Sequence, residues 1–151
     1  MNGLPALLQA QGLKAVKELI ACNGFTVRFG LYLSEEQAQS LMEKRMEALR
    51  ETGRVEFGEG ILKKLIFEFC DSPYIMQDNY VDTLLALQDV FYYFKNESLE
   101  QLSDDELIAF MKRHFDGDCE GSLEYLSSSL LEDLCRGVRY GQAWEEDEDD
   151  R

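Results

Sequence analysis

Apolar residues recur at helical spacing over most of the chain. The longest such segment spans residues 77–95, where apolar side chains in a four-three repeat cover more than half of the circumference of a helix. Amphipathic stripes predict further helices at residues 4–21, 35–51, 60–70, 103–115 and 123–138. The sequence therefore predicts a mainly α-helical, compact domain of five to seven helices, with the segment 77–95 as its central helix.

Two of the predicted helices carry a capping box at their start. Ser34 is followed three residues later by Gln37, and Ser103 is followed in the same way by Glu106. In this motif the serine hydroxyl accepts a hydrogen bond from the backbone N–H of the third residue, whose side chain accepts one from the serine N–H. We expect helices to begin directly after Ser34 and Ser103.

Residues 25–33 follow a different pattern, because apolar and other residues alternate with a period of two. The apolar positions are Phe25, Val27, Phe29, Leu31 and Leu33. Alternation of this kind is typical of a strand, and residues 54–57 form a second, shorter candidate. If the two segments pair antiparallel, they make a small two-stranded β-ribbon that needs helices to pack on, since an isolated hairpin is marginal in water.

Charge excludes several classes of ligand. The 151 residues include 30 Asp and Glu against 15 Lys and Arg, a formal net charge of −15. A surface this negative repels phosphate backbones and anionic lipid headgroups, so we expect neither nucleic acid nor a membrane as partner. Residues 145–151 hold six of the acids and cannot contribute to a core. We predict one helical domain over residues 1–144 and a disordered acidic tail over 145–151.

The chain shows no secretory or membrane-spanning pattern. Its first ten residues lack a basic start followed by a long apolar stretch, and no apolar run approaches the roughly 18–20 residues that cross a bilayer. Four cysteines, at positions 22, 70, 119 and 135, form no Cys-x-x-Cys pair. These spacings favour free thiols in a reducing cytosol, hence a cytoplasmic protein.

Residues 116–127 resemble the calcium loop of an EF-hand. The loop positions that supply oxygen ligands hold Asp116, Asp118, Glu120 and Ser122. Gly121 stands at the turn position, but position 12, which needs a bidentate carboxylate, is Ser127. We therefore interpret the segment as an acidic turn between two helices and keep calcium binding as the weaker alternative.

Catalytic patterns are scarce. His114 is the one histidine, so a metal site with two histidines is excluded. The glycine-bearing segment 53–60 lacks the Lys-Ser/Thr of a phosphate loop, and no glycine-rich nucleophile turn is present. We predict no catalytic residue, no metal and no cofactor.

A tyrosine-rich zone surrounds the break after the helix at 60–70. Its candidate surface residues are Tyr74, Tyr80, Tyr92 and Tyr93. Helical spacing assigns most of them to the core, whereas the functional alternative is a partner-binding patch, because tyrosine offers contact area at small entropic cost. Tyr93 lies off the apolar seam of its helix.

Four segments carry a resemblance to a known family. They are Gly30-Leu-Tyr-Leu-Ser34, Arg54-Val-Glu-Phe-Gly58, Phe69-Cys-Asp-Ser-Pro-Tyr74 and Phe91-Tyr-Tyr-Phe-Lys-Asn-Glu97. In these phrases the chain resembles an uncharacterised family of small acidic bacterial cytosolic proteins, catalogued as a domain of unknown function. The resemblance spans roughly residues 25–135. It implies a bacterial origin and assigns no activity and no site residue.

The function favoured by these observations is that of a non-catalytic interaction or accessory protein in the bacterial cytosol. Its partner would be a protein of unspecified identity, with a basic surface as the favoured case, because the acidic chain attracts positive charge. The competing hypothesis is a small-molecule-binding protein or enzyme with a pocket built from Tyr, Glu and Arg. The oligomeric state is left open.

Overall fold

The computed structural model describes residues 6–139, and in this part of the chain six helices have eight or more residues. The helices are α1 (Ala6–Ala21), α2 (Asn23–Thr26), α3 (Glu35–Thr52), α4 (Leu62–Phe69), α5 (Tyr80–Glu97), α6 (Asp104–Asp116), α7 (Leu123–Tyr125) and α8 (Glu132–Arg139). Two 3₁₀ turns, η1 (Val27–Phe29) and η2 (Gln77–Asn79), precede longer elements, and a π-helical stretch, η3 (Leu126–Leu131), joins α7 to α8. The predicted mainly helical fold is confirmed.

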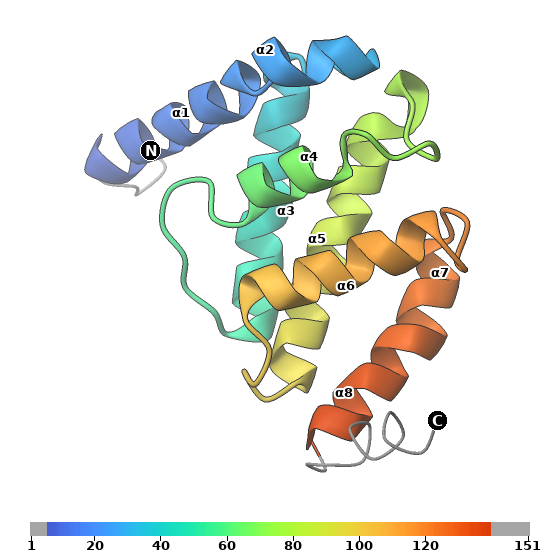
Figure 1. Ribbon diagram of the computed structural model, residues 1–151. Helices are drawn as coiled ribbons and strands as arrows, with labels where there is room; N and C mark the ends of the chain where they lie inside the picture. The colour runs from blue at the N-terminus through green and yellow to red at the C-terminus, as the bar shows by residue number, and fades with distance from the viewer. Residues whose placement is uncertain (1–5, 140–151) are drawn as a thin grey trace.

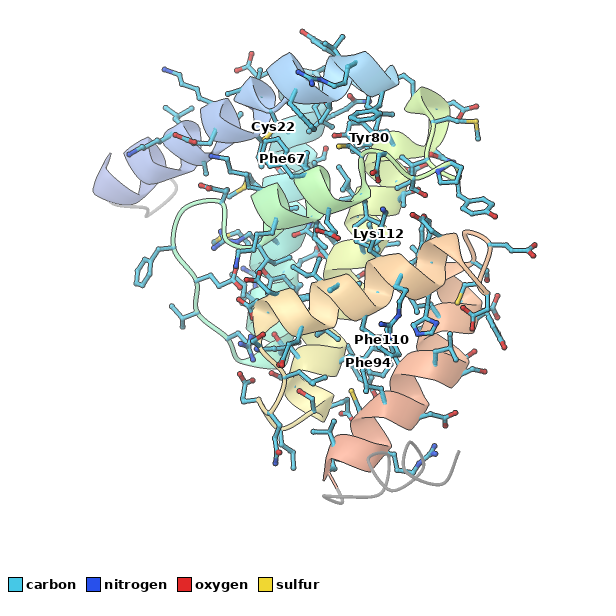
Figure 2. All side chains as sticks on the ribbon, in the orientation of Figure 1. Cys22, Phe67, Tyr80, Phe94, Phe110 and Lys112 are labelled. Atoms are coloured by element: carbon cyan, nitrogen blue, oxygen red, sulfur yellow. The ribbon has the colours of Figure 1, made fainter. Side chains whose placement is uncertain are left out.

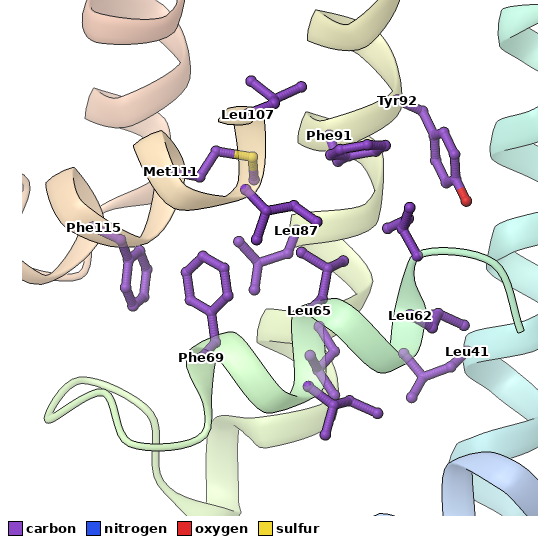
Figure 3. Packing of buried hydrophobic residues seen from close by; sticks show 14 of the residues in the cluster. Leu41, Leu62, Leu65, Phe69, Leu87, Phe91, Tyr92, Leu107, Met111 and Phe115 are labelled. Atoms are coloured by element: carbon purple, nitrogen blue, oxygen red, sulfur yellow. The ribbon is translucent and has the colours of Figure 1, made fainter. Parts of the chain in front are cut away.

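Helix α5 lies at the centre of the packing. It runs beside α3 and also contacts α4, α6 and α8, while α4 and α6 cross in front of the α3–α5 pair (Figure 1). The close-up in Figure 3 shows the side chains that meet between these helices, among them Leu41, Leu65, Phe69, Leu87, Phe91, Met111 and Phe115. This arrangement agrees with the prediction that the segment 77–95 forms the central helix.

Both predicted capping boxes are confirmed. The Ser34 hydroxyl accepts a hydrogen bond from Gln37 N at 3.1 Å, and Gln37 Oε1 accepts one from Ser34 N at 3.0 Å. Ser103 and Glu106 exchange the corresponding bonds at 3.0 and 2.9 Å. Helices α3 and α6 therefore begin at serines whose side chains accept hydrogen bonds from N–H groups in the first turn, which have no partner within the helix.

The predicted ribbon is wrong: residues 6–139 contain no strand, and residues 23–29 are helical. Two buried polar side chains explain the difference. Asn23 accepts a hydrogen bond from Leu33 N at 2.8 Å and donates one to Leu33 O at 2.9 Å, while the Thr26 hydroxyl donates to Leu31 O at 2.9 Å. The side chains thus occupy backbone groups that a partner strand would need, and they fold the segment back on itself.

The second strand candidate, residues 54–57, is a single non-helical segment. Arg54 and Glu56 turn toward the helices, whereas Val55 and Phe57 are 80% and 82% exposed. Residues 54–57 therefore do alternate between inward and outward side chains. The inward residues are held by polar side-chain contacts, and not by a ladder of backbone hydrogen bonds with a second strand.

The first and last predicted helices differ in detail from the structure. The helix predicted at 4–21 corresponds to α1, and the short helix α2 follows it after Cys22. The last predicted helix is continuous but includes the π-helical stretch. The expected tail at 145–151 lies outside the described residues. In the described part, no helix has the length and apolar character needed to span a membrane.

The close approach of Gly121 to Tyr74 leads to a prediction about the stability of glycine-to-alanine variants. The φ of Gly121 is +83°, and an added Cβ would lie 2.7 Å from the Tyr74 side chain. Gly53 has a similar φ of +70° but open space around it. We expect Gly53→Ala to cost about 1 kcal/mol of unfolding free energy through backbone strain alone, and Gly121→Ala to cost about 1–3 kcal/mol more through overpacking.

Urea unfolding at neutral pH measures both differences. Gly24→Ala is the matched control, because this glycine lies in a helix with no atom within 4 Å of the new Cβ, and alanine there should stabilise the protein by up to about 1 kcal/mol. Equal losses for Gly121→Ala and Gly53→Ala would contradict the proposed contact with Tyr74.

Candidate functional site

Three phenylalanine rings gather on the surface at the junction of α2, η1 and α4. The centroid of the Phe25 ring lies 5.8 Å from that of Phe29 and 5.4 Å from that of Phe67, the latter edge-on (Figure 2 labels Phe67). Their residues are 37%, 42% and 42% exposed, in the same order. The guanidinium of Arg28 lies over the Phe25 ring at 4.3 Å and donates from Nε to Phe25 O. We call Phe25, Phe29 and Phe67 the aromatic surface.

The local fold explains why these rings face outward. Asn23 and Thr26 are buried by their hydrogen bonds, so Phe25, which lies between them in the helical turn, points away from their face. Phe29 ends η1 and packs on the outer Phe25 ring. On α4 the buried face consists of Leu62, Leu65, Ile66 and Phe69. Phe67 falls outside that face, so it remains on the surface.

A groove between α4 and α6 adjoins the aromatic surface. It has a volume of about 640 Å³, and Phe67, Ile108 and Ala109 contribute its apolar lining. Charged residues of both signs border it, and one ion pair, between Lys64 Nζ and Asp105 Oδ1 at 2.8 Å, links the two helices. The groove and the aromatic surface share Phe67, so the two features are continuous.

One cluster combines the residue types of the competing pocket hypothesis, Tyr, Glu and Arg, but its side chains pack against one another. Glu56 Oε1 accepts hydrogen bonds from Arg45 Nε at 3.3 Å and from the Tyr92 hydroxyl at 2.5 Å. Arg45 is 3% exposed and Tyr92 is fully buried. Burial raises the pKa of the Tyr92 hydroxyl far above its usual range, and its hydrogen bond to Glu56 raises it further. The cluster is a structural joint between α3, α5 and the loop at 53–61.

A second joint extends from this loop to the end of α5. Arg54 Nη1 donates to Asn96 Oδ1 at 2.8 Å and also pairs with Glu100, and Asn96 Nδ2 donates to Thr52 O at 2.7 Å. Gly60 completes the loop at a φ of +59°, where a Cβ would overlap the Glu56 carboxylate. Both joints fix the loop that precedes α4, and hence the position of Phe67.

The four candidate tyrosines do not form one surface. Tyr80 and Tyr92 are core residues, and burial raises the pKa of Tyr80 to about 12. Tyr74 is half-buried, with its ring edge-on to Phe115 at 6.2 Å. Tyr93 alone of the four is exposed, at 50%. Of the predicted patch, therefore, only Tyr93 offers a largely free ring.

Asp116 and Asp118, the two aspartates of the loop at 116–127, have partners within the protein. Asp116 accepts a hydrogen bond from the Ser72 hydroxyl at 2.6 Å and pairs with Lys112 at 2.9 Å. Asp118 lies 2.9 Å from His114 Nδ1, and the hydrogen bond from His114 lowers the pKa of that carboxyl.

The other two loop positions point elsewhere. The Ser122 hydroxyl caps α7 by accepting from Tyr125 N, and Glu120 is exposed. Within residues 6–139, no three His, Cys, Asp or Glu side chains are placed to share a metal ion.

The four cysteines are buried free thiols. Burial is the main cause that raises the pKa of each, to about 11 for Cys135. A raised pKa disfavours the thiolate, which is the reactive form. These thiols therefore serve as small core side chains.

The fold and the site together define a helical protein that carries contacting, partly exposed aromatic rings beside the α4–α6 groove. The chain belongs to a family of unknown function, DUF6323, whose match covers residues 18–144. No curated protein and no solved structure matches the chain.

Sequence reasoning missed the aromatic surface for two reasons. The period-two pattern predicts a strand for Phe25 and Phe29, and the apolar stripe of the helix at 60–70 indicates only its buried face. One signal was present: Phe67 is the large apolar residue of that helix that falls outside its apolar stripe.

Tyr92 gives a prediction on alkaline stability. An unfolded tyrosine ionises near about pH 10, whereas the folded state keeps Tyr92 protonated to a higher pH. Its contribution to stability is therefore complete below about pH 10 and is lost as the pH rises toward the folded pKa. Tyr92→Phe should lower the free energy of unfolding at neutral pH by about 1 kcal/mol. Above about pH 10 the variant should lose less additional stability than the wild type, because it has no hydroxyl to ionise at this position.

Urea unfolding at neutral pH and at about pH 11 tests this linkage. Tyr80→Phe serves as a comparison, because the pKa of Tyr80 is also raised. An alkaline loss of stability in Tyr92→Phe as large as that of the wild type would contradict the assignment.

The loop at 116–127 gives a prediction on calcium. Because Asp116 and Asp118 already have protein partners and position 12 is Ser127, calorimetric titration of the full chain with millimolar calcium should give no saturable heat. A saturable heat that Asp118→Asn removes would overturn this expectation.

Proposed function

We propose that this chain is a non-catalytic interaction protein that binds an apolar helical segment of a protein partner. The segment would lie in the α4–α6 groove and extend over the aromatic surface. The observation that carries the proposal is that the Phe25 ring contacts both Phe29 and Phe67, while each of the three residues stays more than a third exposed. Contiguous exposed aromatic area of this kind marks interaction sites, whereas isolated exposed apolar residues are ordinary.

The magnitude of the burial favours a partner that fills the groove. Covering the exposed two fifths of one ring removes on the order of 80 Å² of apolar surface from water, or about 2 kcal/mol. Three rings therefore supply about 6 kcal/mol, which barely meets the roughly 4–15 kcal/mol that association costs. A segment that also occupies the groove lined by Ile108 and Ala109 gains the additional contact area that a flat contact lacks.

The shape of the groove supports a helical occupant. Two helices form its walls, and a third helix laid between them repeats the way helices pack in the core. Lys63 and Lys64 on one wall and Glu59, Glu68 and Asp105 around them provide charges of both signs for the rim of such a helix.

We propose the bacterial cytosol as the setting of this interaction. Support comes from the sequence resemblance and from four cysteines that remain unpaired. The net charge of −15 supports a protein partner over nucleic acid or an anionic membrane.

Affinity capture from extracts of the source cells tests the proposal. The full chain is compared with Phe67→Ser, which removes the ring shared by the groove and the aromatic surface, and with the control Tyr125→Ser, whose ring is 46% exposed on α7. We expect one partner to be retained by the wild type and the control and lost at least about tenfold in Phe67→Ser, since covering one ring is worth about 2 kcal/mol.

Two measurements complete the test. Circular dichroism and thermal melting establish that each variant is folded, and sedimentation of the purified chain reports self-association. Capture of the same proteins by all three chains would overturn the proposal, and so would a dimer of the wild type that Phe67→Ser dissociates, because the occupant would then be a second copy.

A further inference from the structure

A second and smaller groove lies between α5 and the π-helical stretch η3. Its volume is about 340 Å³, near the lower end of the range for ligand sites. Its lining residues are Asp89, Val90, Tyr93, Phe94, Ser127, Ser128 and Glu132. The groove thus contains Tyr93, the exposed member of the four candidate tyrosines.

The backbone beside this groove is irregular. Residues 126–131 form π-helical turns, in which hydrogen bonds span five residues. Such turns are rare within α-helical segments, and where they occur they are often at functional sites. Farther along the same segment, α8 is held tightly to α5. The Cys135 thiol lies 3.5 Å from Phe94 O, and Arg139 Nη1 donates to Glu97 O and Oε1 at 3.0 and 3.1 Å.

The groove combines an apolar floor with an acidic rim. Val90 is half-buried and Phe94 is buried, and the Tyr93 ring stands nearly perpendicular to that of Phe94, with centroids 4.8 Å apart. Asp89 pairs with Lys44 at 3.0 Å across to α3. Glu132, on the opposite side, has no ion-pair partner among the described residues. One carboxylate is therefore balanced and the other is available.

We propose that this groove binds an arginine side chain from an exposed segment of a basic protein. The inference rests on the proposed interaction function and names the chemistry of a second contact with the partner. The guanidinium lies against the Tyr93 ring and donates to the Glu132 carboxylate, while the methylene stem covers Val90 and Phe94. The hydroxyls of Ser127 and Ser128 accept further hydrogen bonds from the fork of N–H donors.

The charges select this occupant over others. An anionic ligand would face Glu132 and Asp89, and a purely apolar side chain would leave Glu132 without a partner. Arginine is preferred to lysine because its planar guanidinium stacks on an aromatic ring and is less strongly hydrated than an ammonium group. The net charge of −15 also draws a basic segment toward the protein before contact.

Chemical-shift mapping on the isotope-labelled full chain provides the test. The probes are a short Gly/Ser peptide with one arginine and the same peptide with citrulline, which has the same shape without the charge. We expect the arginine peptide, and not the citrulline peptide, to shift backbone amide signals of Val90, Tyr93, Ser127 and Ser128 in a saturable way at millimolar concentration.

Variants separate the two contacts. Glu132→Gln and Tyr93→Leu should each weaken binding of the arginine peptide about threefold to fivefold. Tyr93→Phe keeps the ring and should bind like the wild type. Glu36→Gln removes one exposed negative charge at the start of α3, outside the groove, and controls for the change in net charge.

Three results would overturn the inference. The first is a set of equal shifts with the citrulline peptide, and the second is no shifts at all. The third is a set of shifts spread over all acidic faces, together with a loss of arginine-peptide binding in Glu36→Gln as large as that in Glu132→Gln. None of them bears on Phe67→Ser, so partner capture that depends on Phe67 would still support the proposed function. Conversely, the arginine peptide could bind specifically while Phe67→Ser captures the same proteins as the wild type. That pair of results would support this groove and refute the α4–α6 site.

Discussion

The buried ion pair between Arg45 and Glu56 is the contact on which the candidate surface depends. A guanidinium that is 3% exposed has almost no access to water, so its charge must be balanced from within the protein. Glu56 supplies that balance from the loop at 53–61 and accepts the Tyr92 hydroxyl as well. Because α4 begins at Leu62, directly after this loop, the pair also sets where Phe67 and one wall of the α4–α6 groove lie.

Cationic side chains elsewhere also join separate elements of this acidic chain. Lys44 connects α3 to α5 through Asp89, Lys112 connects α6 to the turn after α4 through Asp71, and Arg139 connects α8 to α5 through Glu97. The few positive charges are therefore largely engaged in holding helices together. The excess of carboxylates remains on the surface, where it repels other acidic molecules at short range and favours basic partners.

Features set by local rules were predictable from sequence, and features set by distant contacts were not. Ser34 and Ser103 start helices through neighbours three residues away, so their motifs identified them directly. The ribbon failed because Asn23 bonds to Leu33, ten residues away, a contact that periodicity does not report. The aromatic surface also depends on a distant contact, since Phe25 and Phe67 meet only when α2 is placed against α4.

Burial of all four cysteines has a practical consequence for studying this protein. Thiol reagents need an accessible thiolate, and neither condition is met at Cys22, Cys70, Cys119 or Cys135 in the folded chain. A single cysteine introduced on the surface would therefore react first and selectively, without removal of the native ones. The native thiols in turn report opening of the core, because their labelling rate follows the exposure of the helices that cover them.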